Sequence, residues 1–390
     1  MHERSPRFFL WLGNMSTLND IHARWGITAQ HIHGDEFTGY EPVMDQLDSY
    51  TKGDFERDPD RVINEVFDIY RSINLVPIIY YTEQGVINAV RDFQTTDYNR
   101  VDDHRIGLGN NRGQPLSRFL FPNMMTAEPK GRGSNSLKDR FHDDRKLKRA
   151  IKLCFEAREG AHLARPTALR RALELVTGEN IQNFKPQNAR SLVEYLCPYM
   201  FGRVYDYSAG YGGRLLGISS SRMRYQYVGI DPNTETHKYL CYFNDLIYQA
   251  TGVKGEIHND TSESYAPQEI DCAFSSPPYF NLEKYCDEPT QCMVKYQTQA
   301  EWFDGYAEPT MRHIYNGLNA DGVFATNIAD YKSYGNKVYR VVDDWIRTAE
   351  LIGFKHVDTV RMMLNTRPGV GNDKKSGREK WEGVYVFQKK

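Results

Sequence analysis

Cysteine pairs, long apolar runs and a strong charge of either sign are all absent from this chain of 390 residues. The six cysteines, at positions 154, 197, 241, 272, 286 and 292, form no Cys-x-x-Cys pair, which argues against a zinc site or a disulfide framework. No stretch approaches the roughly 18 apolar residues that a membrane-spanning helix needs, and the run RFFLWLG at 7–13 is too short for a signal peptide. We therefore expect a cytoplasmic protein without a metal or a membrane partner.

The charged residues are unevenly distributed, although the net charge is only −2. Two stretches, 129–152 and 367–380, combine lysines and arginines with glycines, which suits a loop that follows a phosphate backbone. A solvated surface is the alternative interpretation of each stretch. The candidate nucleic-acid contacts are Lys130, Arg132, Lys146, Lys148, Arg149, Lys374, Lys375 and Arg378.

Helical periodicity dominates residues 1–183, which are numerous enough for a domain of their own. Predicted helices cover 60–73, 82–93, 145–163 and 165–178, and 75–81 has the pattern of a short strand or a buried connector. The last two helices could form a helix-turn-helix. The segment GLGNNRG (107–113) lacks the Lys-Ser/Thr of a P-loop, so we expect a surface turn there.

Strand and helix patterns alternate from about residue 184 onward. Predicted strands cover 203–210, 225–231, 255–260, 270–276, 322–330, 356–364 and 382–389, and predicted helices cover 234–251, 302–318 and 338–354. This order is typical of a doubly wound, mostly parallel α/β sheet, with the last two strands as an antiparallel hairpin. We therefore expect a catalytic domain in 184–390 behind an N-terminal mixed or helical domain in 1–183.

A glycine-rich turn, DYSAGYGGRLLG (206–217), follows the first of these strands. Glycines let the backbone approach a ligand closely, and the carboxyl edge of a parallel sheet is where α/β folds bind ligands. A dinucleotide fingerprint would need a third glycine where Leu215 stands, and Asp206 would repel a pyrophosphate. A cationic, amino-acid-like ligand fits better. S-adenosylmethionine (SAM) carries an ammonium and a sulfonium and no phosphate.

Two further acids follow the next two predicted strands. Asp231 ends the strand YQYVGID and is placed to accept hydrogen bonds from two ribose hydroxyls. Asp260 ends the following strand, where a carboxylate can accept from an adenine amino group. With Asp206, three acids stand at successive strand ends, a pattern that favours a nucleoside-containing cofactor.

The motif Ser276-Pro277-Pro278-Tyr279 follows the fourth strand. Prolines fix φ and leave carbonyls outside any strand ladder. An exocyclic amine that attacks a methyl sulfonium needs acceptors to orient its lone pair, and the Ser276 side chain and the Pro277 carbonyl can supply them. Tyr279 can stack on a base that has left its duplex.

Together, DYSAGYGG, GID and SSPPYF resemble the SAM-dependent amino-methyltransferases of DNA, which act on N6 of adenine or N4 of cytosine. FKPQNARSLVEYL (184–196) looks like that family's segment at the methionine end of the cofactor, and WEGVYVFQKK like its last strand. The resemblance covers 184–390 and implies a sheet of the class I SAM-methyltransferase type. The cofactor-binding residues that it implies, together with the strand-end acids, are Phe184, Lys185, Pro186, Asp206, Ser208, Gly210, Gly212, Asp231 and Asp260. Ser276, Pro277, Pro278 and Tyr279 would hold the target base of a DNA partner.

Serine at the start of the catalytic motif slightly favours cytosine over adenine as the target base. The chain has no Pro-Cys dipeptide, which excludes a C5-cytosine mechanism and a zinc deaminase. An RNA N2-guanine methyltransferase and a catalytically idle nucleic-acid-binding subunit remain as alternatives. Because the sheet consumes nearly all residues after Tyr279, we expect target recognition largely in 1–183, helped by the 367–380 loop. The sequence does not separate a restriction-modification enzyme from an orphan or phage enzyme.

Overall fold

The computed structural model describes residues 17–129, 136–157, 159–177, 181–332, 337–364 and 380–390. Its centre is an eight-stranded sheet in the order β3-β13-β14-β10-β8-β5-β6-β7. The strands are β3 (Arg105–Ile106), β5 (Arg203–Asp206), β6 (Gln226–Ile230), β7 (Glu256–His258), β8 (Ile270–Ser275), β10 (Leu318–Ile328), β13 (Phe354–Met363) and β14 (Trp381–Lys389). All neighbours pair in parallel except β14, which is antiparallel to both β10 and β13. This confirms the expected doubly wound, mostly parallel sheet with an antiparallel C-terminal hairpin.

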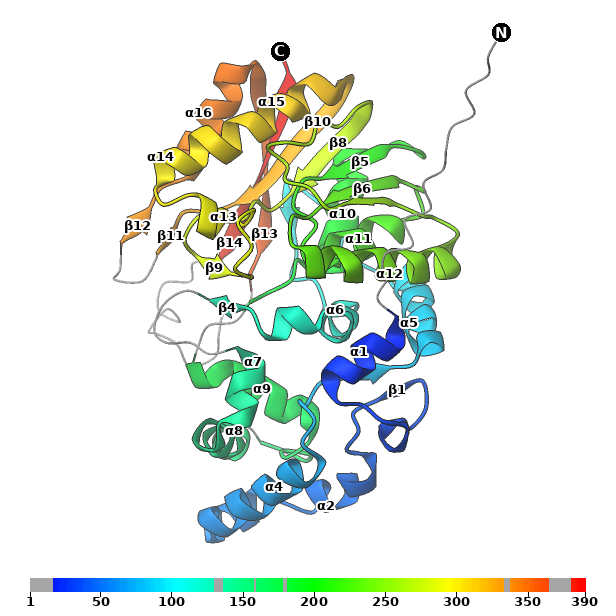
Figure 1. Cartoon of the computed structure of the whole chain (residues 1–390), viewed down its shortest axis with the longest axis vertical. Helices are drawn as coiled ribbons and strands as arrows, with labels where there is room; N and C mark the ends of the chain where they lie inside the picture. Colours follow the sequence, from blue (N-terminus) through cyan, green and yellow to red (C-terminus); the bar gives the residue numbers. More distant parts are fainter. Residues whose placement is uncertain (1–16, 130–135, 158, 178–180, 333–336, 365–379) are drawn as a thin grey trace.

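Helices cover both faces of this sheet (Figure 1). One face carries α10 (Pro186–Leu196), α11 (Gly213–Ser219) and α12 (Thr234–Thr251), and the other carries α14 (Gln299–Trp302), α15 (Glu308–Gly317) and α16 (Val342–Ile352). Successive strand residues enter different cores, as the two-residue period of a strand requires. Val204 and Phe274 join the core under α10–α12, whereas Tyr205 and Ala273 join the core under α15 and α16. Burial on both faces explains why these strands are almost continuously apolar.

The helices begin and end where local chemistry directs. Asn233 caps α12 by accepting from the Thr236 amide at 3.0 Å, and the helix ends at Gly252, whose φ is 74°. The predicted helix 145–163 is shorter than expected and ends at Glu156, because Gly160 (φ 101°) and His162 (φ 64°) adopt left-handed backbone.

Two other predicted elements differ from expectation. The predicted helix 302–318 is interrupted by the π-helical segment η4 (Phe303–Ala307) between α14 and α15. In the predicted helix 338–354 the first residues instead form β12 (Val338–Tyr339), which pairs with β11 (Tyr331–Lys332), and α16 starts only at Val342. Both differences arise in aromatic-rich segments whose packing partners lie far away in sequence.

The first half of the chain is mostly helical. Its helices are α1 (Leu18–Trp25), α2 (Met44–Asp48), α3 (Lys52–Arg57), α4 (Pro59–Ile73), α5 (Glu83–Thr95), α6 (Gln114–Leu120), α7 (Leu137–His142), α8 (Asp144–Glu156) and α9 (Pro166–Thr177), with short turns η1 (Ala29–His31), η2 (Glu41–Val43) and η3 (Pro122–Met125). The predicted strand 75–81 shrinks to β2 (Tyr80–Tyr81), which pairs with β1 (Glu36–Phe37). The segment 157–165 is longer than the roughly three- to four-residue turn of a helix-turn-helix, so that interpretation of α8 and α9 is wrong.

The helical half is joined to the sheet at several places. β3 pairs with the edge strand β13, β4 (Glu128–Pro129) pairs with β9 (Glu283–Lys284), and α5 packs on α12. One hydrophobic core extends through both halves. The boundary after residue 183 stays a prediction. Among the described residues, every helix is too short or too polar to cross a bilayer.

Candidate functional site

The glycine-rich turn connects β5 to α11 at the carboxyl edge of the sheet. Gly210 (φ 55°) and Gly212 (φ 72°) both adopt left-handed backbone, and a Cβ on Gly212 would lie 2.9 Å from a ring carbon of Phe243. A Cβ on Gly213 would lie 2.1 Å from the Phe184 carbonyl oxygen. At Gly210 the space is open, since the nearest atom to such a Cβ is 3.9 Å away. The other two glycines therefore serve packing, and Gly210 leaves room above the turn.

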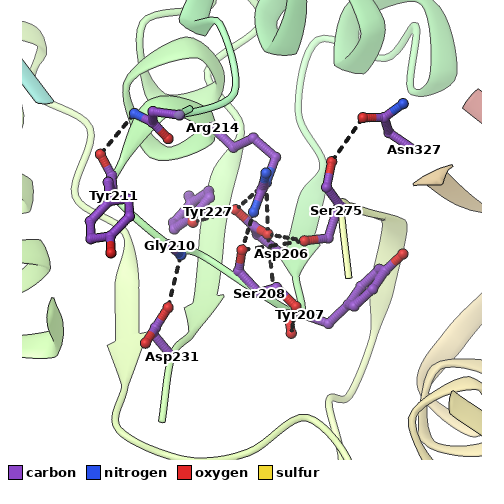
Figure 2. A network of polar contacts seen from close by, with 12 residues as sticks. Asp206, Tyr207, Ser208, Gly210, Tyr211, Arg214, Tyr227, Asp231, Ser275 and Asn327 are labelled. Atoms are coloured by element: carbon purple, nitrogen blue, oxygen red, sulfur yellow. Dashed lines mark hydrogen bonds and ion pairs between the residues drawn. The ribbon is translucent and has the colours of Figure 1, made fainter. Parts of the chain in front are cut away.

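Asp206 lies beneath this turn and is fully buried. Its carboxylate accepts from the Arg214 Nε at 2.9 Å, the Tyr227 hydroxyl at 2.8 Å and the Ser275 hydroxyl at 2.6 Å (Figure 2). Arg214 also donates to the Ser208 carbonyl oxygen. The network ties β5, α11, β6 and β8 together. Direct contact of Asp206 with a cofactor stays a prediction, and its buried, fully used oxygens favour a positioning role.

Asp231 follows β6 and joins the turn from the neighbouring strand end (Figure 2). Its carboxylate accepts from the backbone amides of Gly210 and Asn233, each at 2.9 Å. Burial raises the pKa of Asp231 to about 7, against the effect of these two hydrogen bonds. No described lysine, arginine or histidine forms an ion pair with it. Each carboxylate oxygen keeps a second lone pair for a ligand hydroxyl.

Tyr211, between the two left-handed glycines, has a buried hydroxyl that finds no hydrogen-bond partner among the described residues. Its ring meets the Tyr285 ring edge-on, with the centroids 6.1 Å apart. A buried hydroxyl without a partner costs free energy, so such groups usually serve a ligand or an ordered water. The sequence interpretation missed this residue, although an aromatic side chain inside a glycine turn was a visible signal.

The predicted methionine-end segment lies beside the turn at the start of α10. The Phe184 ring packs edge-on against Phe274, with centroids 5.6 Å apart, and Pro186 is the first residue of the helix. Lys185 instead donates from Nζ to the Gly109 carbonyl oxygen at 2.8 Å, and burial lowers the pKa of its ammonium.

The segment 107–113 is therefore more than the surface turn we expected. Gly109 is buried, and a Cβ on it would lie 2.1 Å from the Asn188 side-chain oxygen. The Asn110 amide donates to the Gln187 side chain at 2.7 Å. This loop of the helical half supports the start of α10.

The catalytic motif lies next to the turn, because Ser275 donates to Asp206. Ser276 donates to the Asn327 side-chain oxygen at 3.1 Å, and Asn327 ends β10. The Tyr279 hydroxyl donates to the Ala329 carbonyl oxygen at 3.1 Å and accepts from its amide at 3.0 Å. These bonds fix the Tyr279 ring, whose centroid lies 4.4 Å from that of Tyr331. Pro277 and Pro278 continue the segment between them.

The other predicted contacts are more scattered. Asp260 is exposed after β7 and accepts from the Thr261 amide at 2.7 Å. On α8, Lys146 lies 4.0 Å from Asp143, Lys148 donates to Asn64 at 2.8 Å, and Arg149 is exposed. Lys130, Arg132, Lys374, Lys375 and Arg378 lie outside the described residues. Within the part of the chain that the structure describes, no cluster of three or more His, Cys, Asp or Glu could hold a metal ion.

No protein-family model matches the chain, and no curated protein sequence matches it. Among solved structures, it is similar to a TehB-like SAM-dependent methyltransferase from Corynebacterium glutamicum, with 16% identity over 57% of this chain and 97% of that chain and a TM-score of 0.33. It is also similar to TrmN from Thermus thermophilus, with 14% identity over 53% and 49% and a TM-score of 0.35. For the magnesium protoporphyrin IX methyltransferase of Synechocystis PCC 6803 the values are 14%, 56%, 89% and 0.34. These identities and TM-scores are too low to assign a function.

Proposed function

We propose that this chain transfers the methyl group of SAM to an exocyclic amine of a DNA base, with N4 of cytosine slightly favoured over N6 of adenine. One observation carries the proposal: the Ser275–Asp206 hydrogen bond holds the Ser-Pro-Pro-Tyr segment against the glycine-rich turn that Asp231 anchors. Donor and acceptor sites of a group transfer must be neighbours, and here two segments 69 residues apart meet at one sheet edge. The sheet order also agrees with the class I SAM-methyltransferase type that the sequence resemblance implies.

The residues around the turn fit SAM. Asp231 has free lone pairs for the ribose hydroxyls, Gly210 leaves space for close approach, and the unpaired Tyr211 hydroxyl offers a further donor or acceptor. Asp260, exposed beyond β7, would accept from the adenine amino group. When bound, SAM supplies an electrophilic methyl group on a cationic sulfur.

The catalytic segment would bind and orient the base. Ser276 and the Pro277 carbonyl would accept hydrogen bonds from the amine, which aims its lone pair at the methyl group. The Tyr279 ring, fixed by two bonds between its hydroxyl and Ala329, would stack on the flipped base. The nitrogen–carbon bond forms as the sulfur–carbon bond breaks, and the nitrogen then releases a proton to water. The helical half, with the basic stretch 129–152, would bind the DNA backbone.

Label transfer from methyl-tritiated SAM tests the proposal, with duplex DNA and total RNA assayed in parallel and nucleosides identified by mass spectrometry. N4-methylcytosine or N6-methyladenine in DNA is the expected product. Asp231→Asn should abolish most of the transfer, whereas Arg312→Met, on an exposed ion pair of α15, should leave it unchanged. Label only in RNA guanine would transfer the activity to an RNA methyltransferase, and no label in either nucleic acid would contradict the proposal.

A further inference from the structure

Glu382 lies at the same sheet edge as the catalytic motif, although it is 106 residues away from Ser276 along the chain (382 − 276). β14 runs antiparallel to β10, so its first residues lie beside the last residues of β10, with Gly383 opposite Ile328. Glu382 itself lies opposite Met362 of β13. The antiparallel hairpin thus returns an acidic side chain to the edge where the parallel strands end.

A hydrogen-bonded bridge connects this acid to the motif. The Asn327 side chain hydrogen-bonds to the Glu382 carboxylate, and its Nδ2 donates to the Gly383 carbonyl oxygen at 3.1 Å. Its oxygen accepts from the Ser276 hydroxyl at 3.1 Å. Asn327 is 9% exposed, so one buried amide holds both the acid and the first residue of the catalytic motif.

The surroundings of Glu382 favour its neutral form. Burial raises the pKa of its carboxyl, opposed by the Asn327 hydrogen bond. No described lysine, arginine or histidine forms an ion pair with it. The other titratable groups at this point are Tyr279 of the motif and the acids Glu283 and Asp330, all three of which disfavour a negative charge nearby or carry one themselves.

A neutral carboxyl presents a donor and an acceptor side by side. Cytosine presents the complementary pair on its pairing edge, an N4 amino group beside the N3 acceptor, and adenine presents N6 beside N1. Guanine presents two donors there, N1 and N2, and an ionised carboxylate would bind it better. Because the amine has two hydrogens, one can face the Pro277 carbonyl while the other faces a second acceptor.

We infer that Glu382, as a neutral carboxylic acid held by Asn327, reads the pairing edge of the target base and selects cytosine or adenine over guanine. This inference rests on the proposed function and adds a specificity residue to it. Truncation should cost roughly 5- to 150-fold in kcat/KM, the range for one good bidentate contact to a base.

The test compares Glu382→Gln, which keeps a donor beside an acceptor, with the apolar Glu382→Leu in the full chain. Once the methylated base is located, each variant is assayed on duplexes containing the normal base or its deaza analogue, 3-deazacytosine or 1-deazaadenine, which lacks the ring acceptor. Glu382→Gln should keep kcat/KM within about threefold, and Glu382→Leu should lose the full contact. On the deaza duplex Glu382→Leu should cause little further loss, because the contact is already missing.

A pH profile separates recognition from a merely structural role. Activity of the unmodified chain should fall as pH rises through the pKa of Glu382, and Glu382→Gln should remove that fall. SAM affinity and the far-ultraviolet circular dichroism spectrum should match in all variants, with the exposed Glu350→Gln as control.

Three results would overturn the inference. They are equal losses in Glu382→Gln and Glu382→Leu, methylation of guanine, and additive losses from Glu382→Leu and the deaza base. If the unmodified chain binds SAM but methylates no nucleic acid, the proposed function fails, and this inference fails with it.

Discussion

Two buried aspartates at neighbouring strand ends have opposite surroundings. Asp206 is fully buried and is paired with Arg214 and with two hydroxyl donors, so all of its charge is compensated inside the protein. Asp231 is 8% exposed and accepts only two backbone amides, with no cation paired to it. The first arrangement builds the turn, and the second leaves a carboxylate with binding capacity. The comparison teaches that strand-end acids with similar sequence context can divide into structural and ligand-binding roles.

Removing the cation of the structural pair should have the largest effect. Arg214→Met leaves Asp206 buried without its partner, and we expect the free energy of unfolding to fall by about 3–5 kcal/mol. Urea denaturation measures it. Arg312→Met, which breaks an exposed pair with Glu308, should change stability by about 0–1 kcal/mol. Similar losses in both variants would mean that the Asp206 network is not the foundation of the turn.

Neutralising the second acid should instead stabilise the protein at high pH. The pKa of Asp231 is about 7 when folded, above its unfolded value, so the folded state holds a proton that the unfolded state lacks. Stability should therefore fall as pH rises from about 4 to about 7. Asp231→Asn should recover up to about 4 kcal/mol at pH 8 relative to pH 5, on the shift to about 7. Parallel stability–pH curves for the two proteins would contradict the assignment.

The motif beside these acids should affect turnover without affecting the cofactor. Tyr279→Ala removes the stacking ring, and we expect a loss of roughly 1–3 kcal/mol in transition-state stabilisation, or about 5- to 150-fold in kcat/KM. Calorimetric affinity for SAM should stay nearly unchanged. Tyr279→Phe, which keeps the ring but loses the bonds to Ala329, should lie between the two. Loss of SAM binding would show that Tyr279 belongs to the cofactor site.

Tyr211 offers the smallest test. Tyr211→Phe removes a buried hydroxyl that has no partner among the described residues, so thermal stability without ligand should stay level or rise by about 1 kcal/mol. SAM affinity should fall by roughly 5-fold, the equivalent of about one hydrogen bond. A stability loss with unchanged affinity would mean that this hydroxyl serves the fold.

The sheet was largely predictable because its strands are apolar, regularly spaced and followed by glycine or acid. Leu215 in place of a third glycine and the prolines after Ser276 were also visible in sequence. The cross-chain partners were not. Nothing local shows that Arg214 folds back under Asp206 or that Lys185 bonds to Gly109, because tertiary contacts decide these pairings.

Other features depend on the same long-range packing. β3 reaches the large sheet only because β13 offers it an edge, and Asn327 meets Glu382 only through the β10–β14 register. The π-helical η4 and the start of α16 depend on aromatic contacts such as that between Trp302 and Trp345, whose ring centroids are 5.8 Å apart. Periodicity predicts such elements but not their interruptions.

The most direct test of the account is SAM affinity at pH 6 and pH 8, measured by calorimetry for the unmodified chain and for Asp231→Asn. Ribose hydroxyls bind the ionised carboxylate, so affinity of the unmodified chain relative to the variant should rise about tenfold between these values, given a free pKa near 7. Taking the ratio removes the titration of the ligand's own amine. A ratio that does not change with pH, or no SAM binding at all, would contradict the assignment of Asp231 to the cofactor.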